Sequence, residues 1–268
     1  MFDLDAYCAR IGYSGPRSAT IATLRAIHAL HPAAIPFENL DPLLGRPVSL
    51  ERYAVAEKLL RQRRGGYCFE QNALLRAALE AMGFSVTGLS ARVVWMAPPE
   101  RPMGPRTHML LRVDLDGDAY IADVGFGGFL LDAPLRLVPD IEQTTPTETL
   151  RFVRAGDGFR QQALIDGEWA DTYLFTLDAQ HPSDYTLGNW YTSTHPQSLF
   201  RNNLMLERRL PDVRISLVNR KLTRRYTDGR IEQRLLTDAA ELLRVLTEDF
   251  AIAPPPWTAG VFERLPVG

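Results

Sequence analysis

The spacing of apolar residues changes near residue 84, and this change most limits the folds open to the chain. Before it, apolar side chains recur every three or four residues, as along one face of an α-helix. After it, they alternate with polar residues in short runs separated by turn residues, as in antiparallel strands. The pattern predicts an α+β protein in which a helical N-terminal third precedes an antiparallel sheet or barrel.

The same pattern predicts individual elements. We expect helices before residue 84 over residues 3–11, 19–31, 50–63 and 68–82. Ser18 is a suitable N-cap for the second helix, and Pro32 should end it, because a residue before proline avoids the α region. Strands are expected over residues 84–86, 89–95, 108–115, 119–124, 150–153, 161–165 and 173–177.

The last third of the chain mixes both patterns. The expected elements are strands over 214–218, 222–226 and 230–235, and a helix over 238–250 capped by Thr237. Asp-Gly pairs at 116–117, 157–158 and 166–167 are hairpin turn signals. We therefore predict three parts: a helical bundle over 1–83, a β-barrel over 84–185 and an α/β unit over 186–268.

Charge and composition exclude several functions. Thirty basic residues against 32 acidic ones give a net charge of -2, so no overall positive field can hold nucleic acid or an anionic membrane. No run of about 20 apolar residues could span a bilayer. The first residues lack the basic and apolar regions of a signal peptide. With only two cysteines, Cys8 and Cys68, a disulfide framework is excluded and a cytoplasmic location is expected.

Residues 64–72, RGGYCFEQN, place a cysteine in the first turn of a predicted helix, behind two glycines. Unpaired N–H groups and the helix dipole there favour the thiolate, the form that attacks carbonyl carbon. The glycines would let the backbone approach a substrate closely. On these grounds Cys68 is either a nucleophile or a small buried apolar residue, as free cysteines often are. Cys8, in the middle of a helix, is expected to be buried packing.

A cysteine nucleophile needs a base, and the base needs a group that orients it. Of the five histidines, His108 stands out because Asp123 follows it across a predicted hairpin. A two-residue turn at 116–117 would pair Leu115 with Asp118. His108 and Asp123 would then be diagonal neighbours on one face of the sheet. A four-residue loop would place them directly opposite, whereas a three-residue loop would send them to opposite faces.

Cysteine, histidine and aspartate in this chain order match the nucleophile, base and orienting acid of covalent acyl transfer. A metal site is less well supported, because the sequence has neither an HExxH nor a CxxC pattern. Residues 125–128, GFGG, lack the strand-to-helix setting of a phosphate-binding loop. We expect no metal and no tightly bound cofactor. The proline-rich loop over 97–105 is long enough to line a site.

Several segments together resemble the arylamine N-acetyltransferases. They are IPFENLD at 35–41, RGGYCFEQN at 64–72, THMLL at 107–111 and ADVGFGG at 122–128, and the likeness extends through STHP at 193–196. The resemblance implies a papain-like cysteine-enzyme core, made of the helical bundle and the β-barrel, with a C-terminal α/β lid. It also implies acetyl-CoA as the acetyl-donor substrate.

The resemblance implies a two-step exchange through three residues. Cys68 matches the nucleophile that becomes acetylated, His108 its general base and acid, and Asp123 the carboxylate that orients the histidine. Acetyl-CoA would acetylate Cys68, and an arylamine or hydrazine would then take the acetyl group while His108 accepts its proton. The Cys68 amide at the helix start is a natural first donor to the oxyanion.

Aromatic positions carry over by motif as well. Phe37 in IPFEN and Phe126 in VGFGG match residues that line the acceptor pocket, and Phe200 matches a third. Trp95 matches an aromatic residue of the coenzyme A cleft in bacterial relatives. Core packing is an equally good interpretation of Trp95 and Phe200.

Other functions stay open. An amide synthase of the same family would close a macrolactam on a carrier-bound polyketide. A cysteine hydrolase on a similar core would hydrolyse acetyl-CoA or peptides even when an amine is supplied. A non-catalytic binding module is disfavoured by the intact Cys68, His108 and Asp123. The expected partners are small molecules, with no nucleic acid and no membrane, and the chain is expected to be a monomer or a homodimer.

Overall fold

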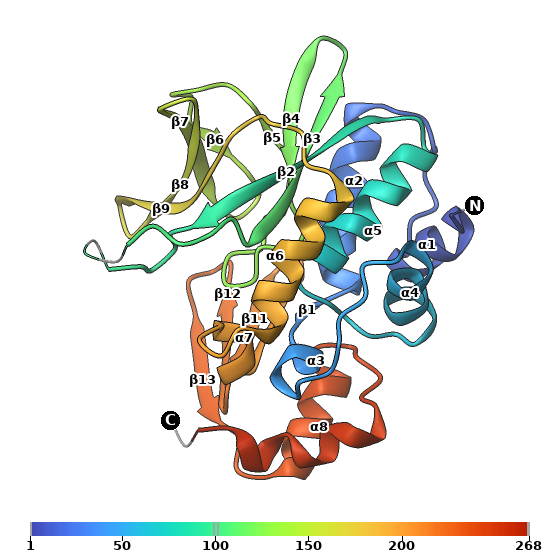
Figure 1. Ribbon diagram of the computed structural model, residues 1–268, viewed down its shortest axis with the longest axis vertical. Helices are drawn as coiled ribbons and strands as arrows, with labels where there is room; N and C mark the ends of the chain where they lie inside the picture. Colours follow the sequence, from blue (N-terminus) through green and yellow to red (C-terminus); the bar gives the residue numbers. More distant parts are fainter. Residues whose placement is uncertain (1, 99, 101, 267–268) are drawn as a thin grey trace.

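The N-terminal part of the computed structural model is helical. The model describes residues 2–98, 100 and 102–266. The helices of this part are α1 (Leu4–Ile11), α2 (Ile21–Ala34), α3 (Leu40–Leu43), α4 (Arg52–Ala56) and α5 (Cys68–Ala81), with a π-helical turn at Glu57–Arg61. Apolar side chains of α1, α2, α4 and α5 share one core with those of strand β3 (His108–Leu115). Figure 1 shows α2 and α5 beside this part of the following sheet.

The middle part is an eight-stranded antiparallel sheet in the order β5-β4-β3-β2-β9-β8-β7-β6. Its strands are β2 (Ser85–Val93), β3 (His108–Leu115), β4 (Asp118–Ala122), β5 (Leu135–Arg136), β6 (Gln143–Thr144), β7 (Thr149–Ala155), β8 (Gly158–Ile165) and β9 (Glu168–Phe175). The edge strands meet through Gln143, whose side-chain amide accepts from the backbone N–H of Arg136 and donates to its carbonyl, both at 2.8 Å. The sheet therefore curls into a nearly closed barrel.

The C-terminal part is a second sheet with helices. Its strand order is β1-β10-β11-β12-β13. The elements are β1 (Phe37–Glu38), β10 (Met205–Arg209), β11 (Val213–Val218), β12 (Lys221–Tyr226), β13 (Ile231–Leu235), α6 (Pro182–Thr194), α7 (Leu199–Asn202), α8 (Ala239–Glu248) and 3-10 turns at Pro256–Gly260 and Phe262–Arg264. Because β1 comes from the N-terminal part, this sheet is joined to the helical bundle by backbone pairing. Figure 1 shows α6 crossing from the barrel toward α7.

The described residues form three hydrophobic cores, and strand β3 lies between two of them, the core of the helical bundle and the core inside the barrel. Met109, Leu111 and Val113 point toward the helical bundle and are buried with it. Leu110, on the opposite face, belongs to the core inside the barrel. Side chains of a strand alternate between faces, so one strand can serve both cores. The α+β arrangement and the papain-like core are confirmed, whereas the division at residues 83 and 185 stays a prediction.

Two helix ends differ from the sequence-based expectation. Helix α2 continues through Pro32 to Ala34, and its cap is Thr20, not Ser18. Pro32 lies in the last turn, where it costs few intrahelical hydrogen bonds, and His31 is held by tertiary contacts. The last helix is capped by Asp238 instead of Thr237, because the Asp238 carboxylate accepts from the N–H three residues on.

The strands also differ from the expectation. Strands β8 and β9 begin earlier than expected, and β5, β6 and β10 were not expected. Residues 84–86 and 89–95 were expected as separate strands, but a single strand, β2, spans Ser85–Val93. It runs through Gly88 because β3 pairs with it without a break from Ser85 to Ala91. The expected turn at 157–158 lies one residue earlier, since Ala155 pairs with Gly158 and Gly156 takes the positive φ of 57°. The turns at 116–117 and 166–167 are confirmed.

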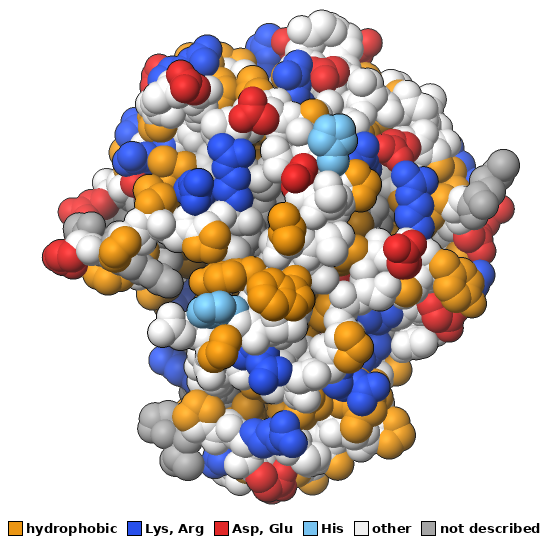
Figure 2. All heavy atoms as spheres, in the orientation of Figure 1, with side chains coloured by type: hydrophobic (Ala, Val, Ile, Leu, Met, Phe, Trp, Pro, Cys, Tyr) orange, Lys and Arg blue, Asp and Glu red, His pale blue; other side chains and the backbone are white. Residues whose placement is uncertain are grey.

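The surface carries charges of both signs in mixture. Figure 2 shows basic and acidic side chains interspersed over one face, with hydrophobic side chains gathered near its centre. Exposed apolar residues on α6 and α7 include Leu187, Trp190 and Leu199. Within the described residues, no helix combines the length and apolarity needed to cross a membrane.

Candidate active site

Cys68 is the first residue of α5, and its surroundings fix that helix start. The backbone N–H of Tyr67 donates to the Glu70 carboxylate at 3.2 Å, which closes the first turn. A side chain at Gly65 would collide with the Pro36 carbonyl, so only glycine lets the two segments approach this closely. The Cys68 side chain is buried, and its Sγ lies 3.6 Å from the Thr107 carbonyl oxygen. The predicted position of the cysteine at a helix start is confirmed.

The hairpin of β3 and β4 has the register that a two-residue turn predicts. Leu115 pairs with Asp118, and Leu111 pairs with Ala122. His108 therefore begins β3 while Asp123 follows the last residue of β4. The His108 Nε2–H donates to the Asp123 carboxylate at 2.6 Å. The structure thus brings the predicted base and its orienting acid into direct contact.

Electrostatics in this pair favour the charged forms of both groups. Burial by itself would lower the pKa of His108, but the attraction and hydrogen bond of the Asp123 carboxylate raise it overall. Burial would raise the pKa of Asp123, but His108 and other hydrogen-bond donors lower it overall. The Cys68 side chain lies beside the His108 ring and also raises the pKa of that ring. Cysteine, imidazole and carboxylate consequently lie next to one another.

Asp123 is held by further groups that were not predicted from the sequence. The Asn72 amide donates to Asp123 Oδ1 at 2.9 Å, and the N–H of Gly125 donates to the same oxygen at 3.0 Å. Nε2 of His28 accepts the backbone N–H of Asp123 at 3.1 Å. Asn72 could have been found, because it lies one helical turn after Cys68 on the same face. His28 carried no such signal, since it comes from a distant helix.

Two buried histidines behind the pair have pKa shifts opposite in sign to that of His108. Burial lowers the pKa of His28 to about 4 and that of His31 to about 3. His31 lies between the Tyr7 hydroxyl, at 2.9 Å from Nδ1, and the Gln71 amide oxygen, at 2.8 Å from Nε2. Both histidines are neutral at pH 7. The prediction that they are packing residues holds for His31, whereas His28 also positions Asp123.

Aromatic rings surround the triad. The Phe126 ring lies edge-on to the His108 ring, with centroids 5.1 Å apart. The Phe37 ring lies 5.7 Å from that of Phe200 and packs directly on Gly127, where a side chain would collide with it. Phe37 and Phe126 are buried, and Phe200 is half-buried. The structure therefore brings Phe37 and Phe200 together, and it places Phe126 separately against the His108 ring.

Trp95 and the loop over 97–105 are the remaining predicted positions. Trp95 is half-buried, and its ring packs on that of Phe129 with centroids 5.3 Å apart. Gly128 lies against the same indole. Of the 97–105 loop, Pro99 and Arg101 lie outside the described residues. The loop leads into Thr107, whose carbonyl touches the Cys68 sulfur.

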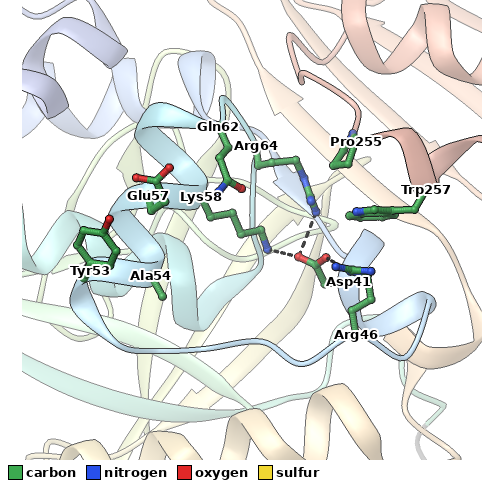
Figure 3. Close-up of a pocket in the computed structure, with 10 residues that line it drawn as sticks. All are labelled: Asp41, Arg46, Tyr53, Ala54, Glu57, Lys58, Gln62, Arg64, Pro255 and Trp257. Atoms are coloured by element: carbon green, nitrogen blue, oxygen red, sulfur yellow. Dashed lines mark hydrogen bonds and ion pairs between the residues drawn. The ribbon is translucent and has the colours of Figure 1, made fainter.

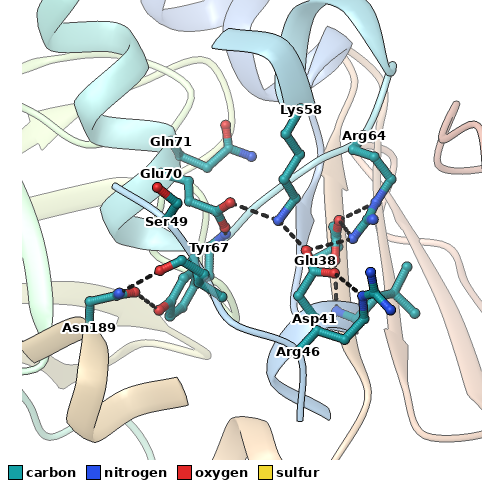
Figure 4. A network of polar contacts seen from close by, with 12 residues as sticks. Glu38, Asp41, Arg46, Ser49, Lys58, Arg64, Tyr67, Glu70, Gln71 and Asn189 are labelled. Atoms are coloured by element: carbon teal, nitrogen blue, oxygen red, sulfur yellow. Dashed lines mark hydrogen bonds and ion pairs between the residues drawn. The ribbon is translucent and has the colours of Figure 1, made fainter. Parts of the chain in front are cut away.

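A network of charged side chains lies behind the start of α5 (Figure 4). Lys58 Nζ lies 2.7 Å from a carboxylate oxygen of both Glu70 and Asp41. Arg64 pairs with two carboxylates. It lies 3.1 Å from Asp41, and its Nε donates to Glu38 Oε1 at 2.8 Å. Glu70 is the residue that closes the first turn of α5. The network therefore supports the cysteine's helix from the side away from His108.

The same network forms one wall of a cavity of about 410 Å³ (Figure 3). Trp257 from the C-terminal tail forms another wall, and the guanidinium groups of Arg46 and Arg64 lie 4.6 and 5.0 Å from its ring centroid. These contacts fasten the tail to the helical bundle. Among the described residues, no three His, Cys, Asp or Glu side chains are arranged to hold a metal ion.

The fold and the site define a class. A cysteine at the start of a bundle helix faces a histidine and an aspartate on the wall of a β-barrel, which is the arrangement of the papain-like cysteine enzymes. Enzymes of that class use an activated thiol as nucleophile.

Comparisons with known proteins identify the family within this class. Residues 20–254 match the family model described as N-acetyltransferase. The chain is 45% identical over 250 residues to the arylamine N-acetyltransferase of Escherichia coli K12, covering 93% of this chain and 88% of the relative. It is 42% identical over 253 residues to that of Mycobacterium tuberculosis H37Rv, covering 93% and 89%. The chain belongs to the arylamine N-acetyltransferase family and is an acyltransferase.

Solved structures agree with this assignment. The arylamine N-acetyltransferase of M. tuberculosis superimposes with a TM-score of 0.91 at 41% identity, covering 94% of each chain. The Mycobacterium marinum enzyme in complex with CoA superimposes with a TM-score of 0.92 at 40% identity, covering 98% of this chain and 96% of that one. The similarity therefore extends over nearly the whole chain.

Proposed function

We propose that the protein acetylates arylamines and arylhydrazines with acetyl-CoA, in two steps, through an acetyl group carried on Cys68. The observation that carries the proposal is the buried hydrogen bond between His108 and Asp123, with Cys68 at a helix start beside the His108 ring. The names of the relatives support the arylamine acceptor, and the M. marinum complex supports coenzyme A as a ligand.

In the first step, the Cys68 thiolate attacks the thioester carbonyl carbon of acetyl-CoA. The new bond joins that carbon to Sγ, and the bond from the carbon to the coenzyme A sulfur breaks. The departing thiolate takes a proton from the His108 imidazolium, a form that Asp123 favours. The Cys68 N–H at the start of α5 is the proposed first donor to the oxyanion.

In the second step, the amine nitrogen attacks the acetyl carbon. Neutral His108 accepts a proton from that nitrogen, the bond to Sγ breaks, and Cys68 leaves as the thiolate. Asp123 stays ionised throughout and stabilises the imidazolium that forms. The proposed acceptor wall consists of Phe37, Phe126 and Phe200, while Trp95 is the proposed contact with coenzyme A. A thiolate mechanism requires reduced cysteine, which fits the expected cytoplasmic location.

Mass spectrometry of the intact protein tests the mechanism. Stoichiometric acetyl-CoA without amine should add one acetyl group, and peptide mapping should place it on Cys68. Cys68→Ser should abolish transfer, whereas the control Cys8→Ser, in a buried helix position, should retain it. Transfer without an acetyl adduct, or an adduct at Cys8, would contradict the covalent mechanism. Release of acetate despite added amine would favour the hydrolase alternative.

The acceptor class needs a separate test. Burying an aryl ring rather than a short alkyl group should gain a few kcal/mol at roughly 25 cal/mol per Å². Aryl amines should therefore exceed aliphatic amines by at least about tenfold in kcat/KM, and Phe126→Ala should reduce that preference while acetyl-Cys68 still forms. Equal rates for both amine classes in the wild type would favour the amide synthase instead.

A further inference from the structure

A buried carboxylate in the C-terminal sheet binds the loop that follows Asp123. Glu207 lies on β10 and is 2% exposed. Its Oε2 accepts from the backbone N–H of Gly128 at 2.6 Å, and its Oε1 accepts from that of Leu130 at 2.9 Å. The backbone of β10 is already paired with β1 and β11, so the sheet does not need this side chain for its own hydrogen bonding.

Arg214 completes this contact from the neighbouring strand. Its Nε donates to Glu207 Oε1 at 2.8 Å, and its other nitrogen donates to the carbonyl of Gly128. Its guanidinium also lies 5.0 Å from the centroid of the Phe129 ring. One ion pair of the C-terminal sheet thus holds both the N–H and the C=O of Gly128. A backbone unit fixed at both polar groups has little freedom to move.

The loop held in this way carries the proposed acceptor wall. Phe126, two residues before Gly128, contacts the His108 ring, and Gly127 supports the Phe37 ring. Phe37 is also the direct pairing partner of Glu207 across β1 and β10. Both aromatic residues are therefore connected to Glu207, one through the loop and one through the sheet.

We propose that Glu207, oriented by Arg214, is a positioning residue that sets the acceptor wall without taking part in acetylation of Cys68. The inference rests on the proposed function, because it assigns Phe37 and Phe126 to the acceptor. Neither Glu207 nor Arg214 contacts Cys68, His108 or Asp123 among the hydrogen bonds and ion pairs of the described residues. A displaced loop should consequently impair the amine step. It can also weaken acetyl-CoA binding, because Gly128 and Phe129 pack on Trp95, but the rate of the thioester step at saturating acetyl-CoA should stay intact.

Separate measurement of the two steps tests this. In Glu207→Gln, one backbone N–H faces an amide NH₂ instead of an oxygen, so the loop loses one of its anchors. The KM for an aryl amine should rise roughly tenfold, and the aryl-over-alkyl preference should fall by a similar factor. The single-turnover rate of acetyl-Cys68 formation, at saturating acetyl-CoA, should stay within about twofold of the wild type.

Two further variants complete the test. Glu232→Gln, on exposed β13 of the same sheet, is the matched control and should leave both steps within about twofold. If Glu207→Gln does not fold, Arg214→Lys replaces it. Lysine keeps the positive charge but cannot bind Glu207 and the Gly128 carbonyl in the same geometry, so the amine step should again be impaired more than acetyl-Cys68 formation.

The outcomes separate this inference from the proposed function. An equal loss in both steps, in a variant with wild-type thermal stability, would overturn the positioning role, and so would unchanged kinetics in both variants. A wild type without an acetyl-Cys68 intermediate or without aryl preference would instead contradict the proposed function itself.

Discussion

Two buried groups of charges flank Cys68, and they differ in what their charges are free to do. In the network behind α5, Lys58 and Arg64 are each paired with two carboxylates. On the other side, Asp123 occupies one nitrogen of His108, and the ring is left in contact with the cysteine. Buried charge alone therefore does not mark a reactive centre. A reactive centre also needs a titratable group that keeps one hydrogen-bonding position free for the reacting atoms.

The pKa values follow the same contrast. Burial would lower the pKa of Lys58, but the surrounding carboxylates raise it overall, so this charge is fixed at every physiological pH. Burial lowers the pKa of His108, whereas Asp123 and, to a smaller extent, Cys68 raise it overall, so its protonation state can change when the charge on the neighbouring sulfur changes. The network can therefore hold the start of α5 in place, whereas the His108–Asp123 pair can transfer a proton.

Removing the charge of Asp123 should have the largest effect on rate. Asp123→Asn keeps the shape but permits the wrong imidazole tautomer, and the corresponding change in a serine-protease triad costs ~10⁴ in rate. We expect a loss of several orders of magnitude in acetyl-Cys68 formation, measured by stopped-flow release of coenzyme A.

Asp114→Asn is the matched control for that measurement. Asp114 lies on the same hairpin and pairs with Arg112 at its surface, so its loss should change the rate less than about twofold. A loss below tenfold in folded Asp123→Asn would show that something else orients His108.

Breaking the network should reduce stability and spare the chemistry. Arg64→Met leaves Glu38 and Asp41 as buried, undercompensated carboxylates, which costs about 3–5 kcal/mol in comparable buried pairs. Urea unfolding should show this loss, while the rate per folded molecule, from active-site titration, should stay within about fivefold.

The control for Arg64 comes from the same segment. Arg61 forms exposed ion pairs with Asp3 and Glu57, so Arg61→Met should cost less than about 1 kcal/mol. The opposite result for Arg64→Met, wild-type stability with a large loss of rate, would mean that the network belongs to the chemistry.

The smallest expected effect concerns the dependence of stability on pH, to which the buried histidines contribute. His28 and His31 have folded-state pKa values below the usual 6.5, so unfolding takes up protons as pH falls and stability decreases. From pH 7 to pH 5 each should cost about 2 kcal/mol. His108 has a raised pKa, so its contribution grows over the same range and offsets roughly 1 kcal/mol.

These three histidines together should therefore lower the wild-type free energy of unfolding by roughly 3 kcal/mol from pH 7 to pH 5, and Glu70 and Glu148, whose pKa values burial raises, offset part of this loss. His31→Gln should start lower at pH 7 but lose about 2 kcal/mol less over that interval. Urea titrations at the two pH values measure both numbers. An equal loss in the wild type and in His31→Gln over that interval would mean that His31 is not held neutral.

Local features of the sequence were enough to predict much of the site. The helix start at Cys68 follows from two glycines before an apolar repeat, and the contact between His108 and Asp123 follows from a two-residue turn. Both inferences use short-range rules, the cap of a helix and the register of a hairpin, which hold whatever the rest of the chain does.

The same rules failed where distant segments set the outcome. Pro32 did not end α2, because contacts from Tyr7 and Gln71 hold the preceding residue in the helix. One support of Asp123, His28, could not be located either, since it precedes Asp123 by 95 residues in the chain. Glu207 is a further example, a charged residue in a strand that a sequence pattern places at the surface.

By itself, then, the sequence determined the change from helices to strands near residue 84, the position of the cysteine and the pairing of histidine with acid, because each depends on neighbours close in the chain. The tertiary structure alone decided which face of the hairpin meets α5, which residues hold Asp123, and that a strand from the N-terminal part completes the C-terminal sheet. Those choices depend on burial and on hydrogen bonds between segments far apart in the chain, which only the packed molecule brings together.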